Sequence, residues 1–382
     1  MNIQKKDIDE YIINNYDIYK DCSVSLYQDI YNLYQIKDDD TNEKYIIQNI
    51  ADFRLNECKE NEKKYNRRKK QLNELKKLKL PDQRTPEWYA LRKKILTASS
   101  LGTAVGKCHF QSREELLYSK IEEVPYVGNE ITEWGVKYED VAIQFYEELY
   151  NVKILDFGLI PHPNFTIFGA SPDGICEDTG NDEYVGRMVE IKCPPKRKFT
   201  KTVLESYKMQ VQGQLEVCDL DECDFFQVKL LEYENFEHYC LDKFEIDGNI
   251  LPGRTILNYP KGATVTYKID DKLSYKYCDL NQTNEGLKNW VDSQDQTNLH
   301  EIKWWKIERY ECTLVIRDNE WWLSNIEYIL LFCKDLEYYK QGDNIDELKE
   351  KMNFQKKNKR KFEIKKLDNF LLESDDSESD SE

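Results

Sequence analysis

The spacing of apolar residues changes repeatedly between about residues 86 and 246, and this alternation limits the available folds more than any other feature. Two stretches have the period of a helix with one apolar face, at about residues 132–150 and 202–217. Strand-like runs lie at about residues 153–160, 166–175, 184–193 and 225–233, and we expect residues 236–246 to pair with the last of them. This order of elements predicts an α/β (α+β) fold with a central mixed β-sheet flanked by helices.

Prolines and composition divide the chain into predicted segments. Pro81 and Pro86 mark a boundary, because proline disfavours helix in the residue before it. In the segment at residues 251–350 we expect two strands and a closing helix at about residues 325–339. The predicted segments are a helical N-terminal extension (1–80), the core (81–250), a C-terminal α+β extension that packs on the core (251–350) and a charged disordered tail (351–382).

Composition restricts the classes of function. The 382 residues include 55 Lys+Arg and 72 Asp+Glu, a net charge of −17, so binding to nucleic acid needs a localised basic channel or a bound cation. No run approaches the roughly 18 uninterrupted apolar residues that cross a bilayer. The 11 cysteines include no C-x-x-C pair, which indicates reduced thiols. We therefore expect an intracellular protein in a reducing compartment, without a membrane partner.

Two short motifs carry the chemistry. Ser-Pro-Asp-Gly places Asp173 in a turn, and the Val-Glu-Ile-Lys-Cys-Pro run puts Glu190 and Lys192 on one face of an apolar strand. Burying opposite charges on an interior strand costs desolvation free energy, which a fold tolerates mainly when the charges have a function or a counter-ion. Two carboxylates at strand ends suit Mg²⁺ or Mn²⁺, and a neighbouring lysine can hold and acidify a water molecule for phosphodiester hydrolysis. A buried Asp–Lys–Glu ion network without catalysis is the alternative.

Two helices offer further candidates. Glu139 lies one residue past the apolar stripe of the helix at about 132–150, where it can reach over the sheet edge; an ordinary surface glutamate is the alternative. Three glutamines, Gln210, Gln212 and Gln214, are spaced two apart, so on a helix they point in different directions. At most one or two of them can line a cleft.

An anion site is predicted upstream. Thr97 or Ser99 can cap a helix whose first N–H groups face an anion, and Arg92 would add a bidentate clamp on phosphate. The alternative is a capping hydroxyl beside a surface arginine.

Taken in order, the motifs W-x-x-x-R-x-x-x-x-T-A-S, W-G-x-x-Y-E, S-P-D-G, E-I-K-C-P and Y-x-x-Q-V-Q span about residues 86–233. This set resembles the lambda exonuclease / YqaJ-type viral recombinase family of the PD-(D/E)xK nuclease superfamily, and the resemblance points to a member from a large DNA virus. It implies that Asp173 and Glu190 bind the metal with the carbonyl of Ile191, and that Lys192 orients the attacking water. It further implies that Glu139 assists the metals, that Gln210 lies near the active centre, and that Arg92 and Ser99 grip the terminal 5′-phosphate with support from Thr97.

The resemblance implies a Mg²⁺-dependent (or Mn²⁺-dependent) DNA exonuclease with two ions. Such an enzyme digests duplex DNA from 5′ to 3′ and leaves 3′ single strands for recombination, repair or replication of viral DNA. The implied partners are double-stranded DNA ends, a single-strand annealing protein and further copies in a homo-oligomeric ring, in the host cytoplasm or nucleus.

Two alternatives stay open at this point. The first is a non-catalytic DNA-end-binding or scaffold protein that retains the nuclease fold. The second is a Cas4-like nuclease with an iron–sulfur cluster, which is disfavoured because only Cys218 and Cys223 are close in sequence and both lack further partners.

Overall fold

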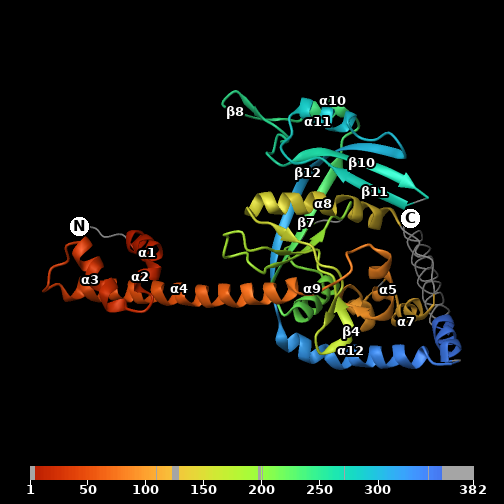
Figure 1. Ribbon diagram of the computed structural model, residues 1–382, viewed down its shortest axis with the longest axis horizontal. Coiled ribbons are helices and arrows are strands. Elements are labelled where there is room, and N and C mark those ends of the chain that lie inside the picture. The colour runs from red at the N-terminus through yellow and green to blue at the C-terminus, as the bar shows by residue number, and fades with distance from the viewer. Residues whose placement is uncertain are drawn as a thin grey trace, which may run out of the picture.

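The computed structural model describes residues 5–108, 110–122, 129–196, 199, 201–270, 272–342 and 344–354. Figure 1 shows a small helical head at the N-terminal end, a long helix that leads away from it, and a body built around a β-sheet. None of the helices in these ranges has an apolar stretch long enough to span a membrane.

The helical head consists of α1 (Lys5–Asn14), α2 (Tyr16–Tyr19) and α3 (Ser23–Leu33) packed on the first part of α4 (Thr41–Lys76). Asp40 begins α4 by accepting a hydrogen bond from the Glu43 N–H. The 36 residues of α4 make it about 54 Å long, so it reaches from the head to the body. The head has its own apolar core, made of Ile8, Ile12, Tyr19, Leu26, Ile30, Tyr31, Ile47, Ala51 and Leu55.

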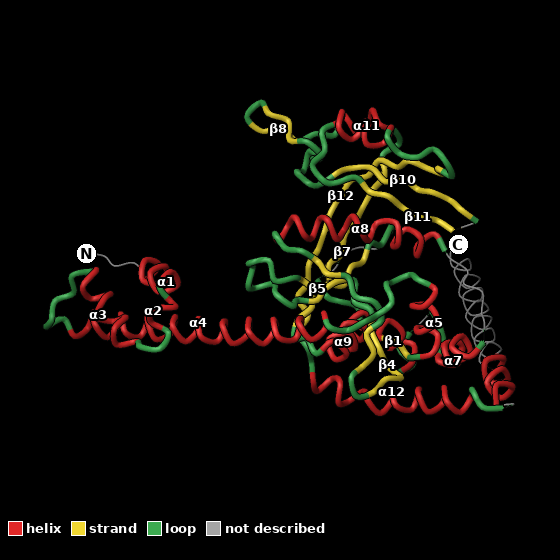
Figure 2. The backbone as a smooth tube through the Cα atoms, in the orientation of Figure 1, coloured by secondary structure: helices red, strands yellow, loops and turns green. Residues whose placement is uncertain are grey.

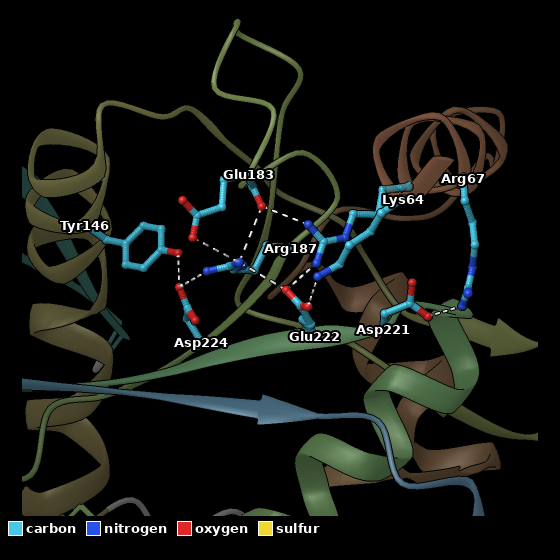
Figure 3. Close-up of polar contacts among 9 residues, drawn as sticks. Lys64, Arg67, Tyr146, Glu183, Arg187, Asp221, Glu222 and Asp224 are labelled. Atoms are coloured by element: carbon cyan, nitrogen blue, oxygen red, sulfur yellow. Dashed lines mark hydrogen bonds and ion pairs between the residues drawn. The ribbon is translucent and has the colours of Figure 1, made fainter. Parts of the chain in front are cut away.

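A buried ion cluster fixes the second half of α4 to the body (Figure 3). Glu222 accepts from Lys64 Nζ at 2.5 Å and from Arg187 Nη2 at 3.0 Å, and it also pairs with the buried Arg68. Asp224 accepts from the Tyr146 hydroxyl at 2.6 Å. Burial alone would raise the pKa of Glu222, but the hydrogen bond from Lys64 and the charges of Arg68 and Arg187 lower it. These contacts favour the charged form of Glu222 and join α4, through Lys64 and Arg68, to β7.

The central sheet has seven strands in the order β11-β10-β12-β7-β6-β5-β2. β6 and β7 are parallel and the other neighbours are antiparallel, so the sheet is mixed. Figure 2 shows the long strands β7 and β12 side by side. The strands are β2 (Ile154–Leu155), β5 (Gly174–Cys176), β6 (Met188–Lys192), β7 (Glu222–Glu232), β10 (Lys261–Ile269), β11 (Lys272–Tyr277) and β12 (Leu299–Ile316).

Two helices cover opposite faces of the sheet centre. α8 (Glu130–Tyr150) packs its apolar stripe on Val189, Ile191 and Phe226. α9 (Glu205–Cys218) packs on the other face, against Met188 and Phe225. Because side chains alternate along a strand, Glu190 and Lys192 face the α9 side together with Met188. The predicted fold class, a mixed β-sheet flanked by helices, is confirmed.

A second sheet, β1-β4-β3, lies against α9. Its strands are β1 (Leu96–Thr97), β3 (Ile160–His162) and β4 (Phe165–Ala170), with β1 parallel to β4. The other elements of the body are α5 (Pro86–Lys94), η1 (Ala98–Ser100), α6 (Leu101–Ala104), α7 (Arg113–Ile121), α10 (Phe236–Leu241), β8 (Phe244–Ile246), β9 (Asn249–Leu251), α11 (Asn284–Asp292) and α12 (Asn319–Tyr339).

Two strand predictions were wrong. Residues 236–246 do not pair with β7, because the Asn235 side chain accepts from the His238 N–H and starts helix α10 there. The neighbours of β7 are β6 and β12. The run at 166–175 is divided between β4 and β5, which belong to different sheets, because the Ser-Pro-Asp turn interrupts it.

The C-terminal region also differs from its prediction. It has three long strands instead of two, and β12 pairs with most of the length of β7, so it continues the central sheet. α12 begins at Asn319, before the predicted residue 325, because Asp318 caps it by accepting from the Trp321 N–H. Residues 351–354 belong to a helix that starts at residue 344, and the rest of the predicted tail lies outside the described residues.

The contribution of the ion cluster to stability can be tested by substitution. Replacing Glu222 by alanine leaves Arg68 and Arg187 buried without their shared anion, which we expect to destabilise the body by about 3 kcal/mol. Asp221→Ala removes only the pair with the exposed Arg67 and should cost about 0–1 kcal/mol. Urea unfolding of both variants checks this, and equal losses of stability would contradict it.

Candidate active site

Glu190 is the most constrained carboxylate of the site. It lies on β6 with only 1% of its surface exposed. Its Oε1 accepts from Gln210 Nε2 at 2.6 Å and pairs with the Lys192 ammonium, and its Oε2 accepts from Gln214 Nε2 at 2.7 Å. Three donors therefore fix both oxygens of a buried carboxylate.

The spacing of the three glutamines on α9 decides which of them reach Glu190. Gln210 and Gln214 are four residues apart and share the face toward Glu190. Gln212 points away from it, where its amide donates to the Ile316 carbonyl at 2.8 Å and accepts from the Asp318 N–H at 2.7 Å. The sequence analysis selected Gln210 and missed Gln214, although the i, i+4 spacing was a usable signal.

Asp173 is linked to the strand of Glu190 by a hydrogen bond from the main chain of β6. It precedes β5, and its Oδ2 accepts from the Ile191 N–H at 2.7 Å. Gly174 lets β5 lie close to β2, because a Cβ at that position would lie 2.1 Å from Ile154 Cγ2. The antiparallel pairing of β5 with β6 thus brings the two acidic residues to adjoining backbone.

Charge is concentrated at this point of the fold. Burial raises the pKa of Asp173 well above its ordinary value, and the charges of Glu190 and Glu139 raise it further. Burial alone disfavours the charged form of Lys192, but the neighbouring Glu190 and Asp173 raise its pKa. The lysine is therefore an ammonium that balances part of the negative charge.

Glu139, from α8, faces a hollow that Asp173 also lines. Burial raises the pKa of Glu139, and the Arg84 guanidinium opposes that effect. Arg84 Nη2 donates to Glu139 Oε1 at 2.7 Å. The remaining residues lining the hollow are Gln83, Asp140, Ile143, Ile154 and Asp156.

The donor set is chemically suited to a hard divalent cation. Asp173 and Glu190 supply carboxylate oxygens, and a cation would offset both the burial and the neighbouring negative charges that raise the pKa of Asp173. In the described part of the chain no three His, Cys, Asp or Glu side chains are grouped so as to enclose an ion, and Glu139 is bound to Arg84 instead. Cys218 and Cys223 are both buried, and among the described residues neither belongs to a cluster of metal-binding side chains.

The residues predicted to bind phosphate are also brought together. The Arg92 guanidinium stacks 4.3 Å above the Trp88 ring, and its Nη2 donates to Ser99 Oγ at 3.3 Å. Thr97 Oγ1 lies 3.1 Å from Ser99 Oγ. Burial lowers the pKa of Arg92 while Tyr89, Asp173 and Glu190 oppose that effect, so the arginine is within electrostatic reach of both acidic residues.

The capping role predicted for Thr97 or Ser99 was wrong. Thr97 precedes η1 but its side chain makes no capping hydrogen bond, and the helix that follows, α6, has only four residues. The hydroxyls bond to one another and to Arg92 instead.

Sequence reasoning missed the segment that joins α4 to α5. Gln83 Nε2 donates to Asp156 Oδ1, to the Phe157 carbonyl and to the Pro172 carbonyl, each at 3.0 Å. Trp88 Nε1 donates to Ser171 Oγ at 3.0 Å. These bonds fix the segment to the Ser-Pro-Asp-Gly turn, and they depend on long-range contacts that no local pattern announces.

The sequence is similar to that of a viral protein. A protein of Acanthamoeba polyphaga mimivirus, described as uncharacterised, is 28% identical over 324 residues, a match covering 75% of this chain and 58% of that protein. The chain thus spans less than two thirds of the length of this relative.

Two solved structures with a similar chain are described as exonucleases. An alkaline exonuclease from Laribacter hongkongensis is 20% identical, with 71% of this chain and 100% of that chain covered and a TM-score of 0.40. A phage-related exonuclease from Haemophilus somnus is 13% identical, with 68% and 96% covered and a TM-score of 0.34. The family model of the YqaJ-like viral recombinase domain matches residues 87–221, which include every site residue predicted from the sequence. This part of the chain is therefore similar to the YqaJ-like viral recombinase domain.

Proposed function

We propose that this protein is a divalent-metal-dependent exonuclease that digests one strand of double-stranded DNA from its 5′ end. The observation that carries the proposal is the meeting of two carboxylates, the buried Glu190 and the half-buried Asp173, at adjoining backbone beside the Lys192 ammonium. The YqaJ-like domain over residues 87–221 supports the same function.

The carboxylates of Asp173 and Glu190 and the Ile191 carbonyl would hold Mg²⁺ or Mn²⁺, with Glu139 assisting a second ion. When bound, such ions lower the pKa of an attacking water and stabilise the charge on the leaving oxygen. Gln210 and Gln214 keep the Glu190 carboxylate in one orientation, so it pays no reorganisation when substrate arrives.

Lys192 acts as a charged donor. Because Glu190 and Asp173 raise its pKa, it keeps its proton at neutral pH and orients the attacking water, or a phosphate oxygen, by donating hydrogen bonds. Its charge also stabilises the negative charge that develops on the phosphoryl group.

Arg92, Ser99 and Thr97 give the proposed polarity. A guanidinium stacked on Trp88 and bonded to a hydroxyl is preorganised to grip a terminal 5′-phosphate. Digestion from that end leaves a 3′ single strand for recombination, repair or replication of viral DNA. A single-strand annealing protein would take up this product, and a ring of copies with a basic channel would reconcile the net charge of −17 with DNA binding.

The central test is digestion of a linear duplex with a labelled, 5′-phosphorylated end, in Mg²⁺ or in EDTA. We expect the wild type to degrade the duplex only with Mg²⁺, and Lys192→Ala to be at least about 100-fold slower because a donor to the reacting atoms is lost. Lys153→Ala, which removes an exposed lysine paired with Glu147, is the matched control and should keep full activity. Equal digestion by wild type and Lys192→Ala would refute the site.

The polarity is tested by comparing duplexes that end in 5′-phosphate and 5′-hydroxyl. The wild type should prefer the phosphorylated end by about tenfold or more, since a charged, bidentate contact is lost with the hydroxyl. Arg92→Gln should abolish this ratio by slowing digestion of the phosphorylated end alone. Equal wild-type rates on both ends would remove the role proposed for Arg92.

A further inference from the structure

The backbone of Arg84 has a conformation that residues other than glycine rarely adopt. Its φ is +65°, in the left-handed region, where a residue other than glycine costs about 1–2 kcal/mol. Strain of this kind persists only where the surroundings enforce it, and it is commonly found at functional sites. Its presence beside the candidate active site therefore requires an explanation.

The segment around Arg84 is held rigidly. A Cβ on Gly158 would lie 2.0 Å from the Pro81 carbonyl oxygen, so the two main chains are in direct contact there. On the other side of Arg84, Thr85 caps α5 by accepting from the Trp88 N–H. Between them, Gln83 bonds to Phe157 and Pro172, and so fixes the segment to the turn that carries Asp173. Arg84 is thus tied, through the bond from Gln83 to the Pro172 carbonyl, to the turn that carries Asp173.

This rigid segment places a guanidinium among acidic side chains. Four carboxylates line the hollow, from Glu139, Asp140, Asp156 and Asp173, and Arg84 is the one basic residue among the lining residues that the structure describes. Its contact is specific, because Nη2 donates to Glu139 Oε1 at 2.7 Å. Glu139 is the carboxylate that the proposed function assigns to the second ion.

We infer that Arg84 is an internal counter-ion that occupies Glu139 in the metal-free protein and competes with the divalent cation for that carboxylate. The inference rests on the proposed function, since it concerns loading of the same site. A guanidinium bonded to Glu139 Oε1 blocks one ligand oxygen and repels an approaching cation. Cation binding at Glu139 Oε1 therefore requires Arg84 to leave that oxygen.

The test is Mn²⁺ binding to the full-length protein, measured by titration calorimetry without DNA. Arg84→Gly removes the guanidinium, and glycine accepts the left-handed backbone without strain. We expect this variant to bind Mn²⁺ about tenfold more tightly than the wild type, because the competitor and its charge are gone. Unchanged or weaker binding would overturn the inference.

A matched control separates this effect from a general change in charge. Arg254 pairs with Glu148 on the same helix as Glu139, but neither residue lines the hollow. Arg254→Gln should leave Mn²⁺ affinity unchanged. A gain equal to that of Arg84→Gly would show a non-specific charge effect and overturn the inference.

A double-mutant cycle tests the route through Glu139. In a Glu139→Gln background the carboxylate that Arg84 bonds to is gone, so the gain from Arg84→Gly should fall to about twofold or less. An equal gain in both backgrounds would refute the assigned contact. Thermal melts in EDTA check folding, and Arg84→Asn, which also tolerates the left-handed region, replaces any glycine variant that fails to fold.

The outcomes distinguish this inference from the proposed function. If the wild type binds Mn²⁺ and Arg84→Gly binds it equally, only the counter-ion role fails. If the wild type binds no Mn²⁺, the metal site of the proposed function fails and the counter-ion role fails with it.

Discussion

The structure depends on bringing two acidic side chains, the buried Glu190 and the half-buried Asp173, to one place. Removing a carboxylate from water is costly unless its oxygens are hydrogen-bonded and its charge is balanced. Here the cost is offset by the Lys192 ammonium, by the amides of Gln210 and Gln214, and by the Ile191 N–H. The balance is incomplete, because burial and the neighbouring acids still raise the pKa of Asp173. This incompletely balanced negative charge is the physical basis of the cation binding that we propose.

Several elements of the fold hold these two side chains in place. The pairing of β5 with β6 sets the two acids on adjoining backbone, and α9 presents its glutamines from the face opposite α8. The short segment after α4 fixes the turn of Asp173 and carries Arg84 to Glu139. The ion cluster around Glu222 anchors α4 to the start of β7, so the long helix joins the helical head to the body that holds the site.

The sequence predicted those features that local periodicity encodes. The alternation on β6 placed Glu190 and Lys192 on one face, and the apolar stripe of α8 predicted that helix and the position of Glu139 at its margin. It did not predict α10, because a capping hydrogen bond from His238 to Asn235 outweighed a strand-like composition. The long pairing of β12 with β7 and the contact of Arg84 with Glu139 join residues far apart in sequence, and nothing local specifies such partners.

The central claim is that Asp173 and Glu190 bind the same divalent ion. Anomalous X-ray diffraction from crystals of the full-length protein grown with Mn²⁺ tests it most directly. The account predicts a Mn²⁺ peak contacted by oxygens of both side chains and by the Ile191 carbonyl. An ion bound elsewhere, or one that touches only one of the two carboxylates, would contradict it.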